Sequence, residues 1–531
     1  MKNFFKNNKN IISHSRTSKK IKYLILLVIV GLAIFLRLFS LGKNPAGFFC
    51  DEASIGYNAY SLVNTGKDEW GQSWPLFFRA FGEYKNPVMT YSVMPSILIF
   101  GLNQFSTRLP SAVYGVLSII LCFLLFKKLF GYKTSLVISY FLSISPWFVH
   151  LSRINLEGIV PMVFFTLLGT YFWVDFIENP SKKYLYLFFS IIGFSLAIYS
   201  YFPARIFIPL YCLSLVITNY RIFWKYPRVF FLSLILTVIF IFPLLNHLIY
   251  GGGLSRWNQV NGNLPIPTLI SKYFEYFTPD YLFFKGDIDL PNQFVTRHSL
   301  RGIGENFPWQ LPFFYFGVIS ALRQYRKNKY SIFLIWLFFY PFTDLFTSGL
   351  YPQATRSLIG VVPVVFFFSI GIIKFLKTIK LKLIKYIFIV GLFLLSLAST
   401  VSLYRLIVNY PGYSSDYWGW QYGAKPVMEY FLTSESSYQQ LCLEGAFNAP
   451  EIFLKFYDPQ NLCQNKCQIC DYTLYDPHKS QLFALSYESY QKLSTSPLEN
   501  NFLIQKNIYY PDTTTAFVIG EFKSKPILKL E

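Results

Sequence analysis

Long apolar runs recur along the chain from Ile21 to about Tyr404, and short basic segments separate them. Each run holds about 20 residues, enough for a helix to cross a hydrocarbon core ~30 Å thick at ~1.5 Å per residue. A shorter apolar segment, 87–101, is expected to lie in or near the membrane interface. The pattern predicts a mostly α-helical, polytopic membrane domain over 21–404 with about eleven transmembrane helices. The expected spans are 21–41, 107–126, 134–150, 158–177, 184–200, 204–219, 229–249, 308–322, 330–348, 356–373 and 386–404.

The charge pattern supports this interpretation and orients the helices. Only 14% of the residues are charged, whereas roughly 25% is usual in soluble domains. The formal net charge is +21, but the basic residues lie in short loops between the apolar runs. That placement is the positive-inside pattern, and it argues against nucleic-acid binding. We therefore expect a cytoplasmic N-terminal tail, 1–20, followed by a retained anchor, because no small-residue cleavage site follows the first run.

The same orientation places two long loops, 42–106 and 250–307, and the segment 405–531 on the outer side of the membrane. In 405–531, short apolar runs alternate with polar stretches, which predicts a small extracytoplasmic α/β domain. The apolar runs are 440–447, 481–487, 501–510 and 515–522, and the helix-like segments are 451–456 and 488–493. Four cysteines in this domain allow three pairings, and an oxidising compartment favours disulfides over a metal site. They are Cys442, Cys463, Cys467 and Cys470.

Many of the acidic and basic side chains that could take part in a reaction lie in the first outer loop. Asp51 and Glu52 follow the first span, at the start of a segment, 53–63, that can be helical. Acids at a helix start have a purely structural explanation, because carboxylates favour the positive end of the helix dipole. Further acids and bases follow in the same loop, however, and such a cluster at membrane depth is costly unless it serves a site. They are Asp68, Glu69, Arg79, Glu83 and Lys85.

A sugar transfer from a phospholipid needs two groups of the kinds found here. A carboxylate can take the proton from the acceptor hydroxyl. A lysine or arginine can stabilise the departing lipid phosphate.

Several short motifs follow one another along the chain. They are Asp51-Glu52-Ala53, Tyr57, Ala59, Thr65-Gly66-x-Asp68, Gly71-x-x-x-Pro75, Lys85-Asn86-Pro87, Arg108-Leu109-Pro110-Ser111, Leu129-Phe130-Gly131, Ser145-Pro146-Trp147, Ser152-Arg153 and Glu157. In this order they resemble the protein O-mannosyltransferase superfamily, which includes the lipid A aminoarabinose transferases. The resemblance covers about the first 180 residues well and extends more weakly to about residue 425. It implies the GT-C fold and a polyprenyl- or dolichyl-phosphate sugar as donor.

The resemblance also implies roles for individual residues. Asp51 matches the acid that acts as catalytic base, and Glu52, its neighbour in the same motif, is expected to be catalytic as well. Lys85 matches a lysine that faces the lipid phosphate. Glu157 matches a second active-site acid, at a position where the family usually has Asp. Arg153, one helical turn earlier, is expected to pair either with Glu157 or with phosphate.

Two further residues complete the expected donor site. Asp68 lies in the matched part of the first loop. Arg356, at the outer end of the tenth span, either binds phosphate or is an interfacial, snorkelling arginine. The family has an acid directly before the lysine, whereas this chain has Tyr84 there and Glu83 one position earlier. That departure puts the family's metal site in doubt, so no metal or other cofactor is expected.

The sequence thus predicts an inverting glycosyltransferase that moves a sugar from a polyprenyl- or dolichyl-phosphate donor to an acceptor hydroxyl on a protein, lipid or glycan. We expect a multi-pass protein of the cell membrane with its C-terminal domain outside. One alternative is a transporter or flippase of a lipid-linked sugar. The acids gather at one membrane face, however, and no paired, interrupted spans mark two matching halves. The other alternative is a glycan ligase or polymerase.

Overall fold

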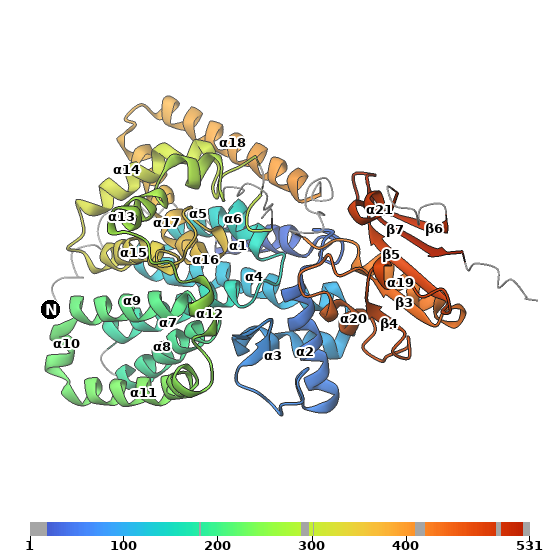
Figure 1. Cartoon of the computed structure of the whole chain (residues 1–531). Coiled ribbons are helices and arrows are strands. Elements are labelled where there is room, and N and C mark those ends of the chain that lie inside the picture. The colour runs from blue at the N-terminus through green and yellow to red at the C-terminus, as the bar shows by residue number, and fades with distance from the viewer. Residues whose placement is uncertain are drawn as a thin grey trace, which may run out of the picture.

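The computed structural model describes residues 19–179, 182–287, 297–300, 302–408, 420–494 and 501–523. A large helical body carries a small sheet domain at one end, next to the helices of the first outer loop (Figure 1). The expected mostly helical body with a small C-terminal α/β domain is confirmed. The expected N-terminal tail, 1–20, falls almost entirely outside the described residues.

Apolar helices occupy every expected span. Proline sets some of their ends, because it removes a backbone donor and disfavours a helical residue before it. Pro146 divides the expected span 134–150 into α5 and α6, and Pro341 lies just after the end of α15. The helices are α1 Lys19–Leu38, α4 Gln104–Phe130, α5 Tyr132–Ile144, α6 Pro146–Leu151, α7 Ile159–Glu178, α8 Lys183–Ile198, α9 Ala204–Thr218, α11 Pro227–Tyr250, α14 Leu311–Leu322, α15 Asn328–Phe339, α17 Val361–Thr378 and α18 Lys382–Val408.

The apolar helices differ in what surrounds them. Among the described residues, five helical segments are long and apolar enough to cross a membrane alone: α4, α7, α11, Ala354–Thr378 (which contains α17) and α18. In the most apolar stretches of α4, α7 and Ala354–Thr378, 67%, 72% and 83% of the residues are buried inside the protein. In those of α11 and α18, only 11% and 22% are buried. An apolar surface of this extent is unfavourable in water. The outer faces of α11 and α18 therefore suit a lipid environment.

The first outer loop folds into a helix, a hairpin and a second helix. The expected helical segment becomes α2 Cys50–Thr65, and the short apolar segment becomes α3 Pro87–Phe100. Between them, β1 Phe78–Ala80 and β2 Glu83–Lys85 pair antiparallel. Helix α3 packs on α2 in a satellite apolar cluster formed by Ile55, Ala59, Met89, Val93 and Ile97. This packing orients the hairpin toward the start of α2.

The C-terminal domain contains a five-stranded mixed sheet in the order β4-β3-β5-β7-β6. Strand β3 pairs parallel with β4 and β5, whereas β7 pairs antiparallel with β5 and β6. Each expected strand and helix is present, and β4 was not expected because it is a three-residue edge strand. The elements are α19 Ala424–Ser434, β3 Gln440–Leu443, α20 Glu451–Tyr457, β4 Cys467–Ile469, β5 Gln481–Ser486, α21 Tyr487–Ser494, β6 Phe502–Tyr509 and β7 Thr515–Phe522.

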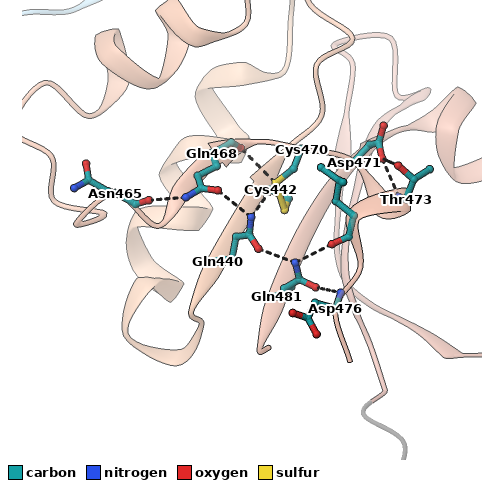
Figure 2. Close-up of a disulfide and its surroundings, with 10 residues drawn as sticks. Gln440, Cys442, Asn465, Gln468, Cys470, Asp471, Thr473, Asp476 and Gln481 are labelled. Atoms are coloured by element: carbon teal, nitrogen blue, oxygen red, sulfur yellow. Dashed lines mark hydrogen bonds between the residues drawn. A yellow bond between two sulfur atoms is a disulfide. The ribbon is translucent and has the colours of Figure 1, made fainter. Parts of the chain in front are cut away.

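The four cysteines of this domain form two disulfides, so the preference for disulfides over a metal site agrees with the structure. The pairs are Cys442–Cys470 and Cys463–Cys467, with sequence separations of 28 and 4. Figure 2 shows the first pair beside side-chain amides that cross from β4 to β5. Gln440 donates to Gln468 at 2.9 Å and accepts from Gln481 at 2.7 Å.

We expect the Cys442–Cys470 disulfide to contribute about 3 kcal/mol to the stability of the domain, because it closes the longer loop. The Cys442→Ser/Cys470→Ser double variant should therefore unfold at a lower temperature in a melt of the full-length, oxidised protein. The Cys463→Ser/Cys467→Ser variant is the matched control and should lose less. Equal losses in both double variants would contradict the chain-entropy argument.

Candidate active site

Three carboxylates surround one buried ammonium group, that of Lys85 in the first outer loop. The β1–β2 hairpin places Lys85, whose side chain is 3% exposed, against the start of α2. Its Nζ lies 2.6 Å from Asp51 Oδ1, 3.4 Å from Glu157 Oε1 and 3.7 Å from Glu83 Oε1. The structure thus brings together three residues that the sequence predicted for the site, Asp51, Lys85 and Glu157. Burial opposes the charge on Lys85, but the three acids together raise the pKa of this lysine.

Asp51 is the most accessible acid of this cluster. It lies in the first turn of α2, where the helix dipole favours a negative charge. Its side chain is 22% exposed, against 6% for Glu83 and 10% for Glu157. Burial alone would raise the pKa of Asp51, but the Lys85 ammonium outweighs that effect and lowers it below its ordinary value. Asp51 is therefore an ionised carboxylate that is partly accessible from outside the protein.

Glu157 reaches the cluster from the turn between α6 and α7. Its backbone has a φ of 53°, a left-handed conformation that costs a non-glycine residue energy and often marks a functional site. Its Oε2 is buried, with no hydrogen-bond partner among the described residues. Glu157 thus has unused acceptor capacity beside Lys85, in a strained turn.

Glu83 carries the remaining carboxyl group, and a second cation approaches it. Arg256, on α12 Ser255–Val260 in the second outer loop, places Nη1 3.1 Å from Glu83 Oε2. Burial, reinforced by repulsion from Glu157 and Asp51, raises the pKa of Glu83 although Lys85 opposes the shift. The protonated form is therefore favoured more at Glu83 than at Asp51. Sequence analysis missed Arg256, because no motif surrounds it.

Arg356 belongs to a separate buried network nearby. Its Nη1 donates to Asp344 Oδ1 at 2.7 Å and to the Thr347 hydroxyl at 2.8 Å. Lys272, on α13 Ile266–Glu275, lies 3.5 Å from the other Asp344 oxygen. Arg356 therefore compensates a buried carboxylate, although its side chain stays 16% exposed. The sequence suggested either phosphate binding or an interfacial position for Arg356, and neither role included an ion pair with Asp344.

Glu52 points away from its neighbour Asp51 into the protein interior. It is fully buried, and both of its carboxylate oxygens accept hydrogen bonds from Arg108 at 2.8 Å. The backbone N–H of Asn155 also donates to Oε1 at 3.0 Å. Glu52 thus ties α2 to α4 and to the turn before Glu157. The geometry favours a positioning role over the catalytic one expected from the resemblance.

We expect Arg108→Met to lower the free energy of unfolding by about 3–5 kcal/mol, because it leaves the Glu52 carboxylate buried and unpaired. Adding Glu52→Gln in the same chain should recover part of the loss. Thermal melts of the two single variants and the double variant measure the coupling. A single Arg108→Met variant as stable as the wild type would contradict the prediction.

Arg153 and Asp68 also lie outside the Lys85 cluster. Arg153 is fully buried and donates to the carbonyls of Leu36 and Phe39, each at 2.9 Å, at the end of α1. It thus satisfies carbonyl groups that a helix end leaves unpaired. Asp68 accepts the backbone N–H groups of Trp70 and Gln72 at 2.9 and 2.8 Å. In this structure Arg153 anchors the end of α1 and Asp68 shapes a turn, and the donor-site roles expected for them stay predictions.

The second outer loop contributes a further acid, Asp287, which lies beside Ala354 and His298. Asp287 Oδ2 accepts the backbone N–H of Ala354 at 3.0 Å and lies 3.2 Å from His298 Nδ1. Burial lowers the pKa of His298 well below its ordinary value. His298 is therefore neutral, and these contacts order the loop over the start of α16 Ala354–Ser357.

Comparisons with known proteins bear on the family resemblance and the fold of this chain. Residues 84–247 match the family model described as dolichyl-phosphate-mannose-protein mannosyltransferase. The structure of ArnT from Cupriavidus metallidurans bound to undecaprenyl phosphate superposes with a TM-score of 0.57 at 11% identity, over 93% of this chain and 97% of that one. This chain has the GT-C glycosyltransferase fold. The apo Archaeoglobus fulgidus oligosaccharyltransferase gives a TM-score of 0.53 at 11% identity, over 95% of this GT-C chain and 75% of the other. The resemblance seen in the sequence is thereby confirmed.

Two relatives match the GT-C chain over part of its sequence. YkcB, a candidate mannosyltransferase of Bacillus subtilis (strain 168), is 28% identical over 173 residues, which are 32% of this chain and 23% of YkcB. An uncharacterized protein of Aquifex aeolicus (strain VF5) is 26% identical over 189 residues, which are 35% of this chain and 36% of that protein. The chain therefore matches well under half the length of either relative.

Proposed function

We propose that this chain is an inverting glycosyltransferase that moves a sugar from a polyprenyl- or dolichyl-phosphate donor to an acceptor hydroxyl at the outer face of the membrane. The observation that carries the proposal is the position of Lys85 between an accessible carboxylate, Asp51, and two less exposed acids. Such a site combines a proton acceptor with a buried positive charge. These are the two requirements of a displacement at an anomeric carbon with phosphate as leaving group.

The proposed reaction is a single displacement. Asp51 takes the proton of the acceptor hydroxyl as its oxygen forms a bond to the anomeric carbon. The bond from that carbon to the phosphate oxygen breaks, and its electron pair stays with the lipid phosphate. Lys85 and Arg256 supply positive charge where the phosphate charge develops. Attack opposite the leaving group inverts the anomeric centre. The proposed step uses these two side chains, and not a divalent metal, as the source of positive charge at the phosphate.

The comparisons support the donor class. The matched family is described by its use of dolichyl-phosphate-mannose, and ArnT is bound to undecaprenyl phosphate. Mannose and a protein acceptor are therefore the first combination to test. The transporter alternative is less favoured, because the charged cluster lies in the outer loops and not in the middle of the spans. The ligase alternative shares the fold, as the oligosaccharyltransferase shows, so the experiment must separate it from single-sugar transfer.

The test is sugar transfer by the purified full-length protein in detergent, with a mixed membrane extract as acceptor. Radiolabelled polyprenyl-phosphate mannose is compared with a polyprenyl-diphosphate oligosaccharide. We expect label to move from the monophosphate donor to a new product with release of lipid phosphate. Transfer from the diphosphate donor alone would establish the ligase class instead. Binding of both lipids with no turnover would favour transport.

A further inference from the structure

The C-terminal domain touches the helix that carries Asp51 at the point where that helix begins. The side-chain oxygen of Gln421 accepts the backbone N–H of Cys50 at 2.7 Å, although the two residues are 371 positions apart. Cys50 is the first residue of α2 and the neighbour of Asp51. The first N–H groups of any α-helix need acceptors from outside the helix. The side chain of a cap residue reaches the second or third N–H of a helix, so the acceptor for the Cys50 N–H comes from a distant part of the chain.

Gln421 is itself held in one orientation. Its side-chain nitrogen donates to the Asn448 carbonyl at 2.9 Å, so the amide has a carbonyl partner at one end and an N–H partner at the other. The residue is 1% exposed and has a φ of 54°. A non-glycine residue keeps this conformation only where its surroundings fix it. The adjacent Trp420 is also 1% exposed and packs edge-on against His150 at 6.2 Å between ring centres.

The interface between the first outer loop and the C-terminal domain is not completely filled by side chains. A cavity of about 390 Å³ lies between the first outer loop and the C-terminal domain, and Gln421 lines it together with Phe48, Gln104 and Tyr457. A cavity wall is more free to shift than a close-packed core. The directional hydrogen bond from Cys50 to Gln421 therefore contributes more to the position of the helix start than it would in a filled interface.

We propose that Gln421 is a positioning residue of the active site, through which the C-terminal domain fixes the start of α2 and thereby Asp51. The inference rests on the proposed function, because Asp51 is the base of that reaction. Glu52 and its Arg108 partner hold the same turn from the side of α4. Gln421 holds it from the C-terminal domain, so that domain is a structural part of the proposed catalytic centre.

The decisive variant is Gln421→Met, which keeps the length of the side chain and removes both hydrogen bonds. We expect kcat to fall about 10–100-fold, because small displacements of a catalytic group have effects of this size. The KM for the lipid donor should not change, since the Lys85 and Arg256 side chains stay in place. Gln421→Glu keeps an acceptor for the Cys50 N–H and should retain more activity than Gln421→Met. Gln468→Ala, which removes an exposed amide elsewhere in the same domain, is the matched control.

Rates are normalised to the protein that remains folded, judged by its melt and by donor binding. Two results would overturn the inference: a folded Gln421→Met variant with wild-type kcat, or equal losses in the Met and Glu variants. A role in stability alone would reduce the folded fraction without changing kcat per folded molecule. Failure of the proposed function is distinct, because the wild-type protein would then transfer no sugar in the same assay.

Discussion

Asp51→Asn is expected to lower kcat for sugar transfer about 1,000-fold while leaving donor binding intact. A general base contributes about 10²–10⁴-fold, and an amide cannot take the acceptor proton. The substitution preserves size, and α2 keeps the Gln421 and Glu52 contacts that fix its start. The Lys85 ammonium also keeps Glu157 and Glu83 as partners, so the site remains close to charge balance.

The measurement is single-turnover transfer from radiolabelled polyprenyl-phosphate sugar at saturating enzyme, with donor binding measured separately. Asp280→Asn is the matched control, because Asp280 is an exposed acid of the second outer loop whose partner is Lys285. It should behave as wild type. Normal turnover by Asp51→Asn would remove Asp51 from the role of base, and Glu157 would be the next acid to test.

Lys85→Gln is expected to lower kcat about 100–1,000-fold, because it removes a preorganised charge from the departing phosphate. It should also change the pH dependence. In the wild type, the Lys85 ammonium holds the pKa of Asp51 below its ordinary value, so the base stays ionised as the pH falls through the usual carboxyl range. In the variant, burial still raises that pKa, while Arg256 and Arg297, which follows in the second outer loop, lower it. Repulsion between Glu83 and Asp51 adds to the rise. The acidic limb of the rate profile should therefore move to higher pH.

The profile is measured as kcat/KM against pH for wild type, Lys85→Gln and the control Lys67→Gln, which changes an exposed lysine of the same loop. A loss of rate in Lys85→Gln without movement of the acidic limb would separate phosphate stabilisation from control of Asp51. An unchanged rate would show that Arg256 alone supports the leaving group.

The helical body could be predicted because its pattern is local. Runs of apolar residues between basic loops mark helices wherever they fold, so each expected span contains one. The strands of the C-terminal domain were visible for the same reason. Their order in the sheet was not, because the parallel pairing of β3 with both β4 and β5 depends on contacts between distant segments.

Whether an expected residue reaches the Lys85 cluster depends on the direction in which its side chain points. The resemblance located Asp51, Lys85 and Glu157, and the fold brings them together. Glu52 is adjacent to Asp51 in sequence, but successive helical residues do not share a face. Arg153 was expected to pair with an acid or a phosphate, yet its partners are carbonyl groups at the end of α1, more than 100 residues away. A sequence pattern contains no information about such partners.

The hydrogen bond between Cys50 and Gln421 has a consequence for the order in which the protein is made. Synthesis produces Asp51 and Lys85 early, whereas the acceptor at the start of α2 follows 371 residues after Cys50. Until that late segment has emerged and folded, the helix that carries Asp51, the proposed base, lacks one of its anchors. Under the proposed function, an unfinished chain would contain Asp51 and Lys85 without their working geometry. It should therefore transfer sugar slowly until the C-terminal domain has folded against the start of α2.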